Sequence, residues 1–388
     1  MPGLRSRDLA LIIAVAVLSA IVGCVREVDG GPPGEVLHLQ GTAIGSSPEN
    51  LDFVLVHDLV VDSQGQVYVI GHAEQVTVLD SRGRAIRTIG RQGEGPGEFL
   101  GIGSIDLGPG DTLLVYDVQL NRLTAYGPGS GTPAYTVRVR AEFPMFPFTL
   151  KSIGDGRLVG LYRLAYGSGT GRERGGEQFE LLRLMAGDGA LLRDSLLLLR
   201  ERRHIEVADG RGTTVFMNPF SPRSLIRTAS AGRIVTAWTD SLRFRVYTPD
   251  GELLRTLDLP ETVTRRPITN AERDSLIEDY AEDRPLGPAL RREIDRLGQT
   301  TWPLLQDFAL DDRGWIWYAL TPARGATEVE WTAVDDRGME RERLTLPAAA
   351  RLWTVRQRVA YVSETDSLDV PRVVIYDLQP ARRGGGAE

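Results

Sequence analysis

The chain has 388 residues, of which 42% are hydrophobic and 25% charged, a composition that suffices for one large or two ordinary domains and differs from that of a disordered chain. Its 43 glycines, 22 prolines and five methionines favour many short elements joined by turns, and therefore an all-β fold. The net charge of −7 excludes a general nucleic-acid binder, and the single cysteine excludes internal disulfides and Cys-x-x-Cys zinc sites.

The first 24 residues have the pattern of a secretory signal. Arg5 and Arg7 precede an apolar run, Leu9–Val22, which at about 14 residues is too short to span a bilayer but suits a signal peptide. The run ends in Ile21-Val22-Gly23-Cys24, which resembles the lipobox of bacterial lipoproteins. This resemblance implies that residues 1–23 are a lipoprotein signal peptide and that Cys24 is lipidated. An uncleaved anchor and an ordinary secretory signal with an accidental cysteine are the alternatives.

Residues 24–34 are rich in glycine and proline, which predicts a flexible tether between membrane and domain. Val25 follows the cysteine, whereas an aspartate there would resemble an inner-membrane retention signal. We therefore expect the protein in the cell envelope, lipid-anchored to the outer membrane and facing the periplasm or the exterior. The predicted partners are the membrane and an unidentified protein or small-molecule ligand. We expect a monomer that binds no nucleic acid.

A repeated apolar-Asp-x-x-Gly pattern predicts hairpin turns. It occurs at Val61–Gly65, Leu79–Gly83, Leu310–Gly314 and Val334–Gly338. Such turns suit this pattern because the aspartate side chain caps the turn and glycine accepts a positive φ. A calcium loop is the alternative, but these segments lack the alternating oxygen ligands of a twelve-residue loop.

The turns occur in pairs, as four-stranded antiparallel units require. Corresponding turns at Gly65, Asp111 and Gly156 are 46 and 45 residues apart, within the roughly 40 to 50 residues of a propeller blade. Six units are predicted, at about 58–90, 104–137, 148–184, 224–259, 306–346 and 348–378. The predicted fold is thus an all-β, six-bladed β-propeller of four-stranded antiparallel blades over residues 35–380, followed by a disordered tail, 381–388.

Two insertions lengthen the repeat. The first comprises residues 167–176 and 200–219, and the second, residues 261–301, follows blade four and is predicted to be helical. The helices either pack on the side or bottom of the propeller or cover its central mouth. The strand-like run Glu35–Leu39 could pair as the outer strand of the last blade and so close the ring.

One segment resembles a known family. Residues 90–99, Gly-Arg-Gln-Gly-Glu-Gly-Pro-Gly-Glu-Phe, are similar to the link between blades in NHL-type propellers, and especially to that of bacterial six-bladed β-propeller lipoproteins. Asp117 and Asn121-Arg122-Leu123 resemble the Asp-x-x-Asn-x-Arg-Val of those repeats, with spacing that differs by one. The resemblance implies the propeller fold, but this family includes scaffolds, receptors, lactonases and lyases, so it implies no single activity.

The sequence contains no standard catalytic motif. His57 and His72 flank the predicted turn of the first hairpin symmetrically, so they are expected at one rim of the ring. With Asp58 and Asp307 they would be the catalytic residues of a metal-assisted hydrolase, lactonase or lyase, the alternative function, which would use Ca²⁺ or another divalent ion. An ordinary pair of polar side chains at an exposed rim is the simpler interpretation.

The preferred interpretation is a non-catalytic ligand- or protein-binding module without cofactor or metal. Its expected binding surface is the central mouth, which the first residues of the inner strands surround. Alignment of the turns places five candidates there, namely Asp58, Ser104, Phe148, Arg223 and Asp307. Lys151, the only lysine, is expected to be solvated or ion-paired.

Overall fold

The computed structural model describes residues 36–47, 53–139, 145–164, 178–208, 212–229, 232–281, 286–366 and 368–381. All of them belong to the unit that spans Val36–Glu388. The predicted signal peptide, Cys24, the tether and residues 382–388 lie outside the described residues. Among the residues that are described, no helix is long and apolar enough to cross a membrane.

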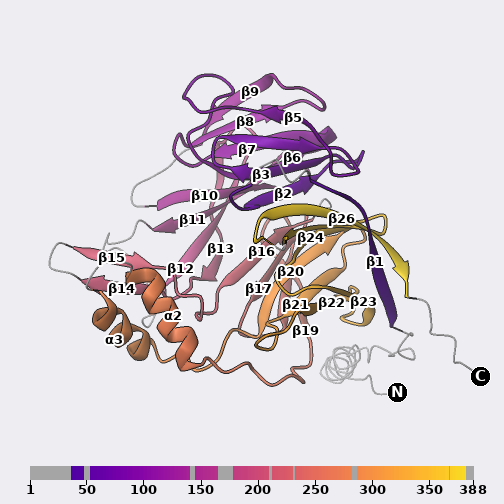
Figure 1. Cartoon of the computed structure of the whole chain (residues 1–388). Helices are drawn as coiled ribbons and strands as arrows, with labels where there is room; N and C mark the ends of the chain where they lie inside the picture. Colours follow the sequence, from indigo (N-terminus) through magenta and orange to yellow (C-terminus); the bar gives the residue numbers. More distant parts are fainter. Residues whose placement is uncertain are drawn as a thin grey trace, which may run out of the picture. The chain divides into compact units, whose positions relative to one another are not determined.

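Six four-stranded blades form the main part of this unit (Figure 1). Four of them are separate sheets, and the fifth and sixth are joined into one closed eight-stranded sheet. The first blade contains β2 (Asp58–Val61), β3 (Val67–His72), β4 (Gln75–Leu79) and β5 (Ala85–Ile89). The second contains β6 (Ile102–Gly108), β7 (Thr112–Asp117), β8 (Arg122–Tyr126) and β9 (Pro133–Arg138). The third contains β10 (Met145–Ser152), β11 (Leu158–Leu164), β12 (Phe179–Met185) and β13 (Leu191–Arg200).

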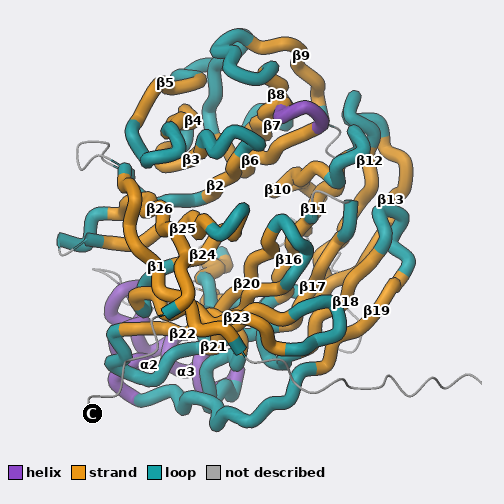
Figure 2. Tube along the Cα trace, turned by 90° about the vertical axis from the view of Figure 1, so that its right-hand side faces the viewer, coloured by secondary structure: helices purple, strands orange, loops and turns teal. Residues whose placement is uncertain are grey.

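The remaining blades follow the same order. The fourth contains β16 (Ser224–Thr228), β17 (Ile234–Trp238), β18 (Arg243–Tyr247) and β19 (Leu253–Asp258). The fifth contains β20 (Leu305–Asp311), β21 (Ile316–Leu320), β22 (Glu328–Val334) and β23 (Glu340–Pro347). The sixth contains β24 (Arg351–Arg356), β25 (Val359–Thr365), β26 (Pro371–Pro380) and β1 (Leu37–Ser46). Figure 2 shows the first strand of each sheet near the centre of the ring. The predicted six-bladed propeller is confirmed.

Strand β1 closes the ring. It pairs antiparallel with β26, from Leu39 opposite Pro380 to Ser46 opposite Val374, and so becomes the outer strand of the sixth sheet, as predicted. Short parallel pairings of β1 with β23 and of β20 with β24 also join the fifth and sixth sheets. The N-terminal strand therefore covers an edge of β26 that would otherwise be free to pair with another chain.

The repeated Asp-x-x-Gly segments form the predicted turns. In each, the aspartate Oδ1 accepts the backbone N–H groups of the residues two and four positions later, at 2.8–3.0 Å. The four aspartates are Asp62, Asp80, Asp311 and Asp335. The glycine of each turn has a φ of 78–80°, which favours a residue without a side chain. These oxygens cap the backbone, which is the role that the turn interpretation assigns to them.

The segment that resembles NHL-type links also has a structural role. Phe99 is fully buried between the first and second sheets. The Arg122 guanidinium donates to the carbonyl oxygens of Glu94, at 2.7 Å, and Glu98. The Asp117 carboxylate accepts the N–H of Leu100 at 2.7 Å. The motif therefore fixes the chain between two blades.

The two insertions pack on one another. The described part of the first forms the hairpin β14 (Ile205–Ala208) and β15 (Thr213–Phe216), and the second contains α2 (Asn270–Ala281) and α3 (Gly287–Leu297). Residues 167–176 lie outside the described residues. Buried apolar side chains of the hairpin and both helices form one small core, composed of Ile205, Val207, Ile277, Leu286, Leu290 and Ile294.

Local signals explain where these helices begin and end. Thr269 and Glu272 form a capping box at the start of α2, in which the Glu272 carboxylate accepts the Thr269 N–H at 2.9 Å. Gly298, with a φ of 71°, ends α3 and donates its N–H to the carbonyl oxygen of Asp295. The hairpin β14–β15 lies between β13 and β16, and the two helices lie between β19 and β20. Both therefore connect an outer strand to the next inner strand and join the propeller at the end where its inner strands begin.

Candidate functional site: a charged cluster in the central channel

Charged side chains occupy the inner strands, which are otherwise mostly apolar. Asp311 and Arg356 are at the last positions of β20 and β24. The other seven, four cationic and three carboxylates, are called the channel cluster: Asp58, Asp106, Lys151, Arg223, Arg227, Asp307 and Arg351. They lie on or immediately before the first strands of all six sheets. The strands β2, β6, β10, β16, β20 and β24 surround the centre in Figure 2. Ion pairs between these strands bring members of the cluster together near the centre of the ring.

Asp58 and Lys151 connect the first three blades. Lys151 Nζ lies 2.7 Å from Asp58 Oδ2 and donates to the carbonyl oxygen of Ile105 at 2.8 Å. Asp58 Oδ2 also accepts the N–H of Ile105 at 3.0 Å. The Asp58 side chain is 12% exposed and that of Lys151 26% exposed. Lys151 is thus ion-paired, one of the two states expected for it.

Asp106 lies beside this pair and is enclosed by backbone. Its carboxylate accepts the N–H groups of Leu107 at 2.8 Å and Ser152 at 2.7 Å. Burial raises its pKa to about 6, and the negative charge of Asp58 acts in the same direction, although Lys151 and the two N–H groups oppose the shift. Asp106 can therefore change its charge near neutral pH.

Three arginines surround Asp307 on the opposite blades. Arg227 Nη2 lies 2.6 Å from Asp307 Oδ1, and Arg351 Nε lies 2.9 Å from Asp307 Oδ2. Burial disfavours the charged carboxylate, but Arg227, Arg351 and Arg223 outweigh it and hold the pKa of Asp307 below its usual value. Burial also lowers the pKa of Arg223 and Arg227. One carboxylate therefore balances only part of the charge of three guanidinium groups.

Two of the five predicted binding residues have other roles. The Ser104 hydroxyl donates to the carbonyl oxygen of Leu150 at 3.1 Å and accepts its N–H at 2.9 Å, which joins β6 to β10. The ring of Phe148 lies under the Arg163 guanidinium, 3.7 Å from its Cζ. The other three, Asp58, Arg223 and Asp307, belong to the channel cluster.

His57 and His72 lie at the same end of the first hairpin, as expected, since the His57 N–H donates to the carbonyl oxygen of Ile70 at 2.9 Å, but the two predicted aspartates pair with cations of the channel cluster. His57 Nε2 contacts the carbonyl oxygen of Gly103 at 3.2 Å, whereas the His72 ring lies 6.4 Å from that of Phe53. Asp58 and Asp307 are ion-paired in different parts of the channel. Within the described ranges, no three His, Cys, Asp or Glu side chains form a group that could hold a metal ion.

The alignment of the turns does not include Asp106, Arg227 or Arg351, and the sequence predicts Lys151 only as a solvated or ion-paired side chain. The sequence does mark Asp106 and Arg227 as unusual, because each is a charged residue within an apolar inner strand, as in Ile105-Asp106-Leu107. A charged residue in such a strand must pair or face water. The sequence does not show which partner it finds, since the partners come from other blades.

Comparisons with known proteins agree on the fold. A family model described as a 6-bladed beta-propeller (DUF5128) matches residues 51–151. No curated protein matches the chain. The chain is similar to a candidate exported protein from Bacteroides fragilis, with a TM-score of 0.52, 10% identity and coverage of 89% of this chain and 96% of that one. It is also similar to a member of the DUF4221 family from Bacteroides vulgatus, with a TM-score of 0.51, 9% identity and coverage of 89% and 99%.

A weaker similarity, with a TM-score of 0.44 and 10% identity, relates the chain to virginiamycin B lyase from Staphylococcus aureus, with coverage of 88% of this chain and 99% of that one. A score of this size supports no argument about function. The first two comparisons, with TM-scores of 0.52 and 0.51 and identities of 10% and 9%, show a shared fold and leave the activity open.

Proposed function

We propose that this chain is an exported, lipid-anchored propeller of the bacterial cell envelope that binds an anionic ligand or protein segment in its central channel without catalysing a reaction. The observation that supports the binding role is the arrangement of Arg223, Arg227 and Arg351 around the single carboxylate of Asp307. This differs from a pocket of unpaired carboxylates and imidazoles, which metal-assisted hydrolysis would require.

The charge balance of the channel cluster favours an anion. Its four cationic and three acidic side chains leave one positive charge, and two when Asp106 is protonated. A charged recess with walls of low dielectric concentrates the electric field and attracts ions of opposite sign. Arginine suits carboxylate and phosphate groups because its guanidinium donates several hydrogen bonds in one plane. We therefore expect a ligand with at least one carboxylate or phosphate.

A binding experiment with citrate as the probe tests this role. The detergent-solubilised full-length protein should bind citrate, and Arg227→Gln should weaken the affinity at least tenfold, equivalent to about 1.4 kcal/mol. Affinity for the citrate trianion, calculated after allowing for the protonation of citrate itself, should rise as the pH falls through about 6, because Asp106 then loses its negative charge. Isothermal titration calorimetry between pH 5 and 8 measures both effects.

Arg243→Gln is the matched control for this experiment. Arg243 also pairs with an aspartate, Asp258, but both side chains are more than half exposed and lie on the outer strands of the fourth sheet. Its replacement should leave citrate affinity unchanged. Equal affinities of the wild type and Arg227→Gln would exclude the channel as the anion site.

Separate observations support the proposed lipid anchor at Cys24. The lipobox-like Ile21–Cys24 predicts a diacylated cysteine, and two acyl chains attach a protein stably to a membrane because each buried methylene contributes about 0.8 kcal/mol. The similarity to a candidate exported protein from Bacteroides fragilis agrees with export.

Replacement of Cys24 by alanine should move the protein from the membrane fraction to the soluble fraction. Immunoblots of fractionated cells measure this distribution, and Val25→Ala, which keeps the cysteine, is the control that should remain in the membrane fraction. If Cys24→Ala also remained there after a high-salt wash, lipidation of Cys24 would not be the anchor.

A further inference from the structure

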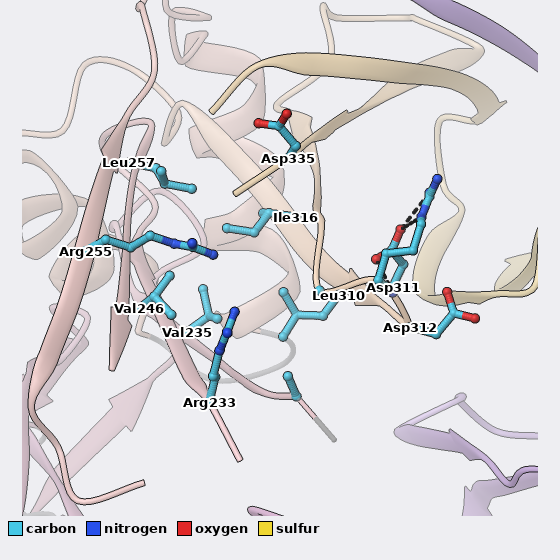
Figure 3. Close-up of a pocket in the computed structure, with 13 residues that line it drawn as sticks. Arg233, Val235, Val246, Arg255, Leu257, Leu310, Asp311, Asp312, Ile316 and Asp335 are labelled. Atoms are coloured by element: carbon cyan, nitrogen blue, oxygen red, sulfur yellow. Dashed lines mark hydrogen bonds and ion pairs between the residues drawn. The ribbon is translucent and has the colours of Figure 1, made fainter. Parts of the chain in front are cut away.

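A pocket lies between the fourth and fifth blades, where the inner strands β16 and β20 end. Figure 3 shows the side chains that line it. Its volume is about 160 Å³, and a cavity of about 150 Å³ can hold benzene. Five aliphatic side chains line it, namely Val235, Val246, Leu257, Leu310 and Ile316. Asp311, on its wall, is four residues after Asp307 in β20, or about 13 Å along the strand. The pocket is therefore separate from the channel cluster.

Four charged groups on the pocket wall already have protein partners, namely Asp311, Asp312, Arg313 and Asp335. Asp312 Oδ2 accepts the N–H of Gln357 at 2.8 Å. Asp311 pairs with Arg313 and caps its own turn, and Arg313 also reaches Glu342 at 2.8 Å. The Asp335 carboxylate accepts the Nε–H of Arg341 at 2.8 Å and two backbone N–H groups. These groups stabilise the two turns, and their hydrogen-bonding capacity is largely used within the protein.

Two arginines on the other wall have unused donors. Arg255 Nε is buried and has no hydrogen-bond partner among the described residues, and its Nη1 is 3.4 Å from Asp336, whose side chain is 65% exposed. The Arg233 side chain is exposed, and no hydrogen bond or ion pair joins its guanidinium to another described residue. Figure 3 shows that both guanidinium groups extend toward the same space beside Ile316. Two positive groups and an aliphatic wall therefore border one small pocket.

We propose that this pocket binds a small aliphatic carboxylate, whose charged group lies between Arg233 and Arg255 and whose hydrocarbon chain lies on Val246, Leu257 and Ile316. Guanidinium groups bind carboxylates through paired N–H donors. The aliphatic wall favours a ligand with a hydrocarbon chain because burial of each methylene strengthens binding. The pocket volume of about 160 Å³ limits that chain to roughly three to five carbons. Either a free short-chain acid or the C-terminal residue of a peptide presents this chemistry.

Binding of valerate to the full-length protein in detergent tests the proposal. Ligand-detected NMR or calorimetry should show that valerate binds at least tenfold more tightly than valeramide, which lacks the charge, and more tightly than acetate or inorganic phosphate, which lack the chain. Gly-Gly-Val and its C-terminal amide distinguish the two sources. Preference for the free peptide over both its amide and valerate identifies a peptide terminus, and preference for valerate identifies a free acid.

Variants test the two arginines. Arg233→Gln and Arg255→Gln should each weaken valerate binding at least tenfold without changing citrate binding in the channel. Arg245→Gln is the matched control, since this exposed arginine is on β18 beside Val246 but does not line the pocket. Equal binding of valerate and valeramide, or unchanged valerate affinity in both arginine variants, would overturn the proposal.

Discussion

Replacement of Gly45 by alanine is expected to destabilise the propeller by about 3 kcal/mol and to lower its Tm by roughly 5–10 °C. Gly45 is in β1, where a Cβ atom would overlap the backbone carbonyl of Arg82 in the turn between β4 and β5. Because the clash is with backbone atoms of Arg82, rotation of a side chain cannot relieve it. The strand would have to move away from the first blade, which weakens the closure between the last blade and the first.

Gly127→Ala is the matched control for this substitution. Gly127 also lies in the propeller, but a Cβ atom there would have no neighbour within 4 Å, and its φ is not positive. We expect its effect on the free energy of unfolding to stay within about 0.5 kcal/mol. Differential scanning calorimetry of both variants measures the contrast, and equal Tm values would show that close packing of β1 contributes little to stability.

Asp307→Asn should cost about 2–3 kcal/mol of unfolding free energy at pH 7. The Asp307 side chain is only 9% exposed, and its replacement leaves Arg227, Arg351 and Arg223 facing one another without a carboxylate. Breaking a buried ion pair by removal of one partner costs about 3–5 kcal/mol. The value expected here is smaller because the Arg351 side chain is 38% exposed. Urea unfolding of the wild type and the variant measures the difference.

The pKa of Asp307 predicts how the stability loss in Asp307→Asn changes with pH. The arginines lower the pKa of folded Asp307, so the ionised carboxylate stabilises the protein above its unfolded pKa of about 3.9. This contribution is lost as the pH falls through the lower folded pKa. The difference in unfolding free energy between the wild type and Asp307→Asn should therefore be largest at pH 7 and decrease below about pH 4.

Asp258→Asn is the control for the buried pair. Asp258 pairs with Arg243, but their side chains are 60% and 53% exposed, and such surface pairs contribute about 0–1 kcal/mol. Its replacement should change the stability by no more than about 0.5 kcal/mol at any pH. A similar loss in both variants would mean that enclosure in the channel adds nothing to the Asp307 pair.

The fold was largely predictable because its signals are local. The Asp62 and Asp311 turns depend on a carboxylate, two N–H groups and a glycine within five residues. Such a motif therefore forms the same turn in any blade. The closing strand was predictable for a related reason, since Leu37–Ser46 is an extra strand in a chain whose last blade would otherwise have three. The sequence alone thus determined the type and number of the blades and the closure of the ring.

The tertiary structure decided which side chains meet. Lys151 is 93 positions from Asp58, and Asp307 is 80 positions from Arg227, so each pair forms only when the ring places distant inner strands next to one another. The packing of the first insertion on the helices of the second is also absent from any local pattern. Turn spacing predicts where each blade begins but not the register between blades. The sequence therefore determined the repeated unit, whereas the charge pairing in the channel and the pocket between the fourth and fifth blades depend on how those units are arranged.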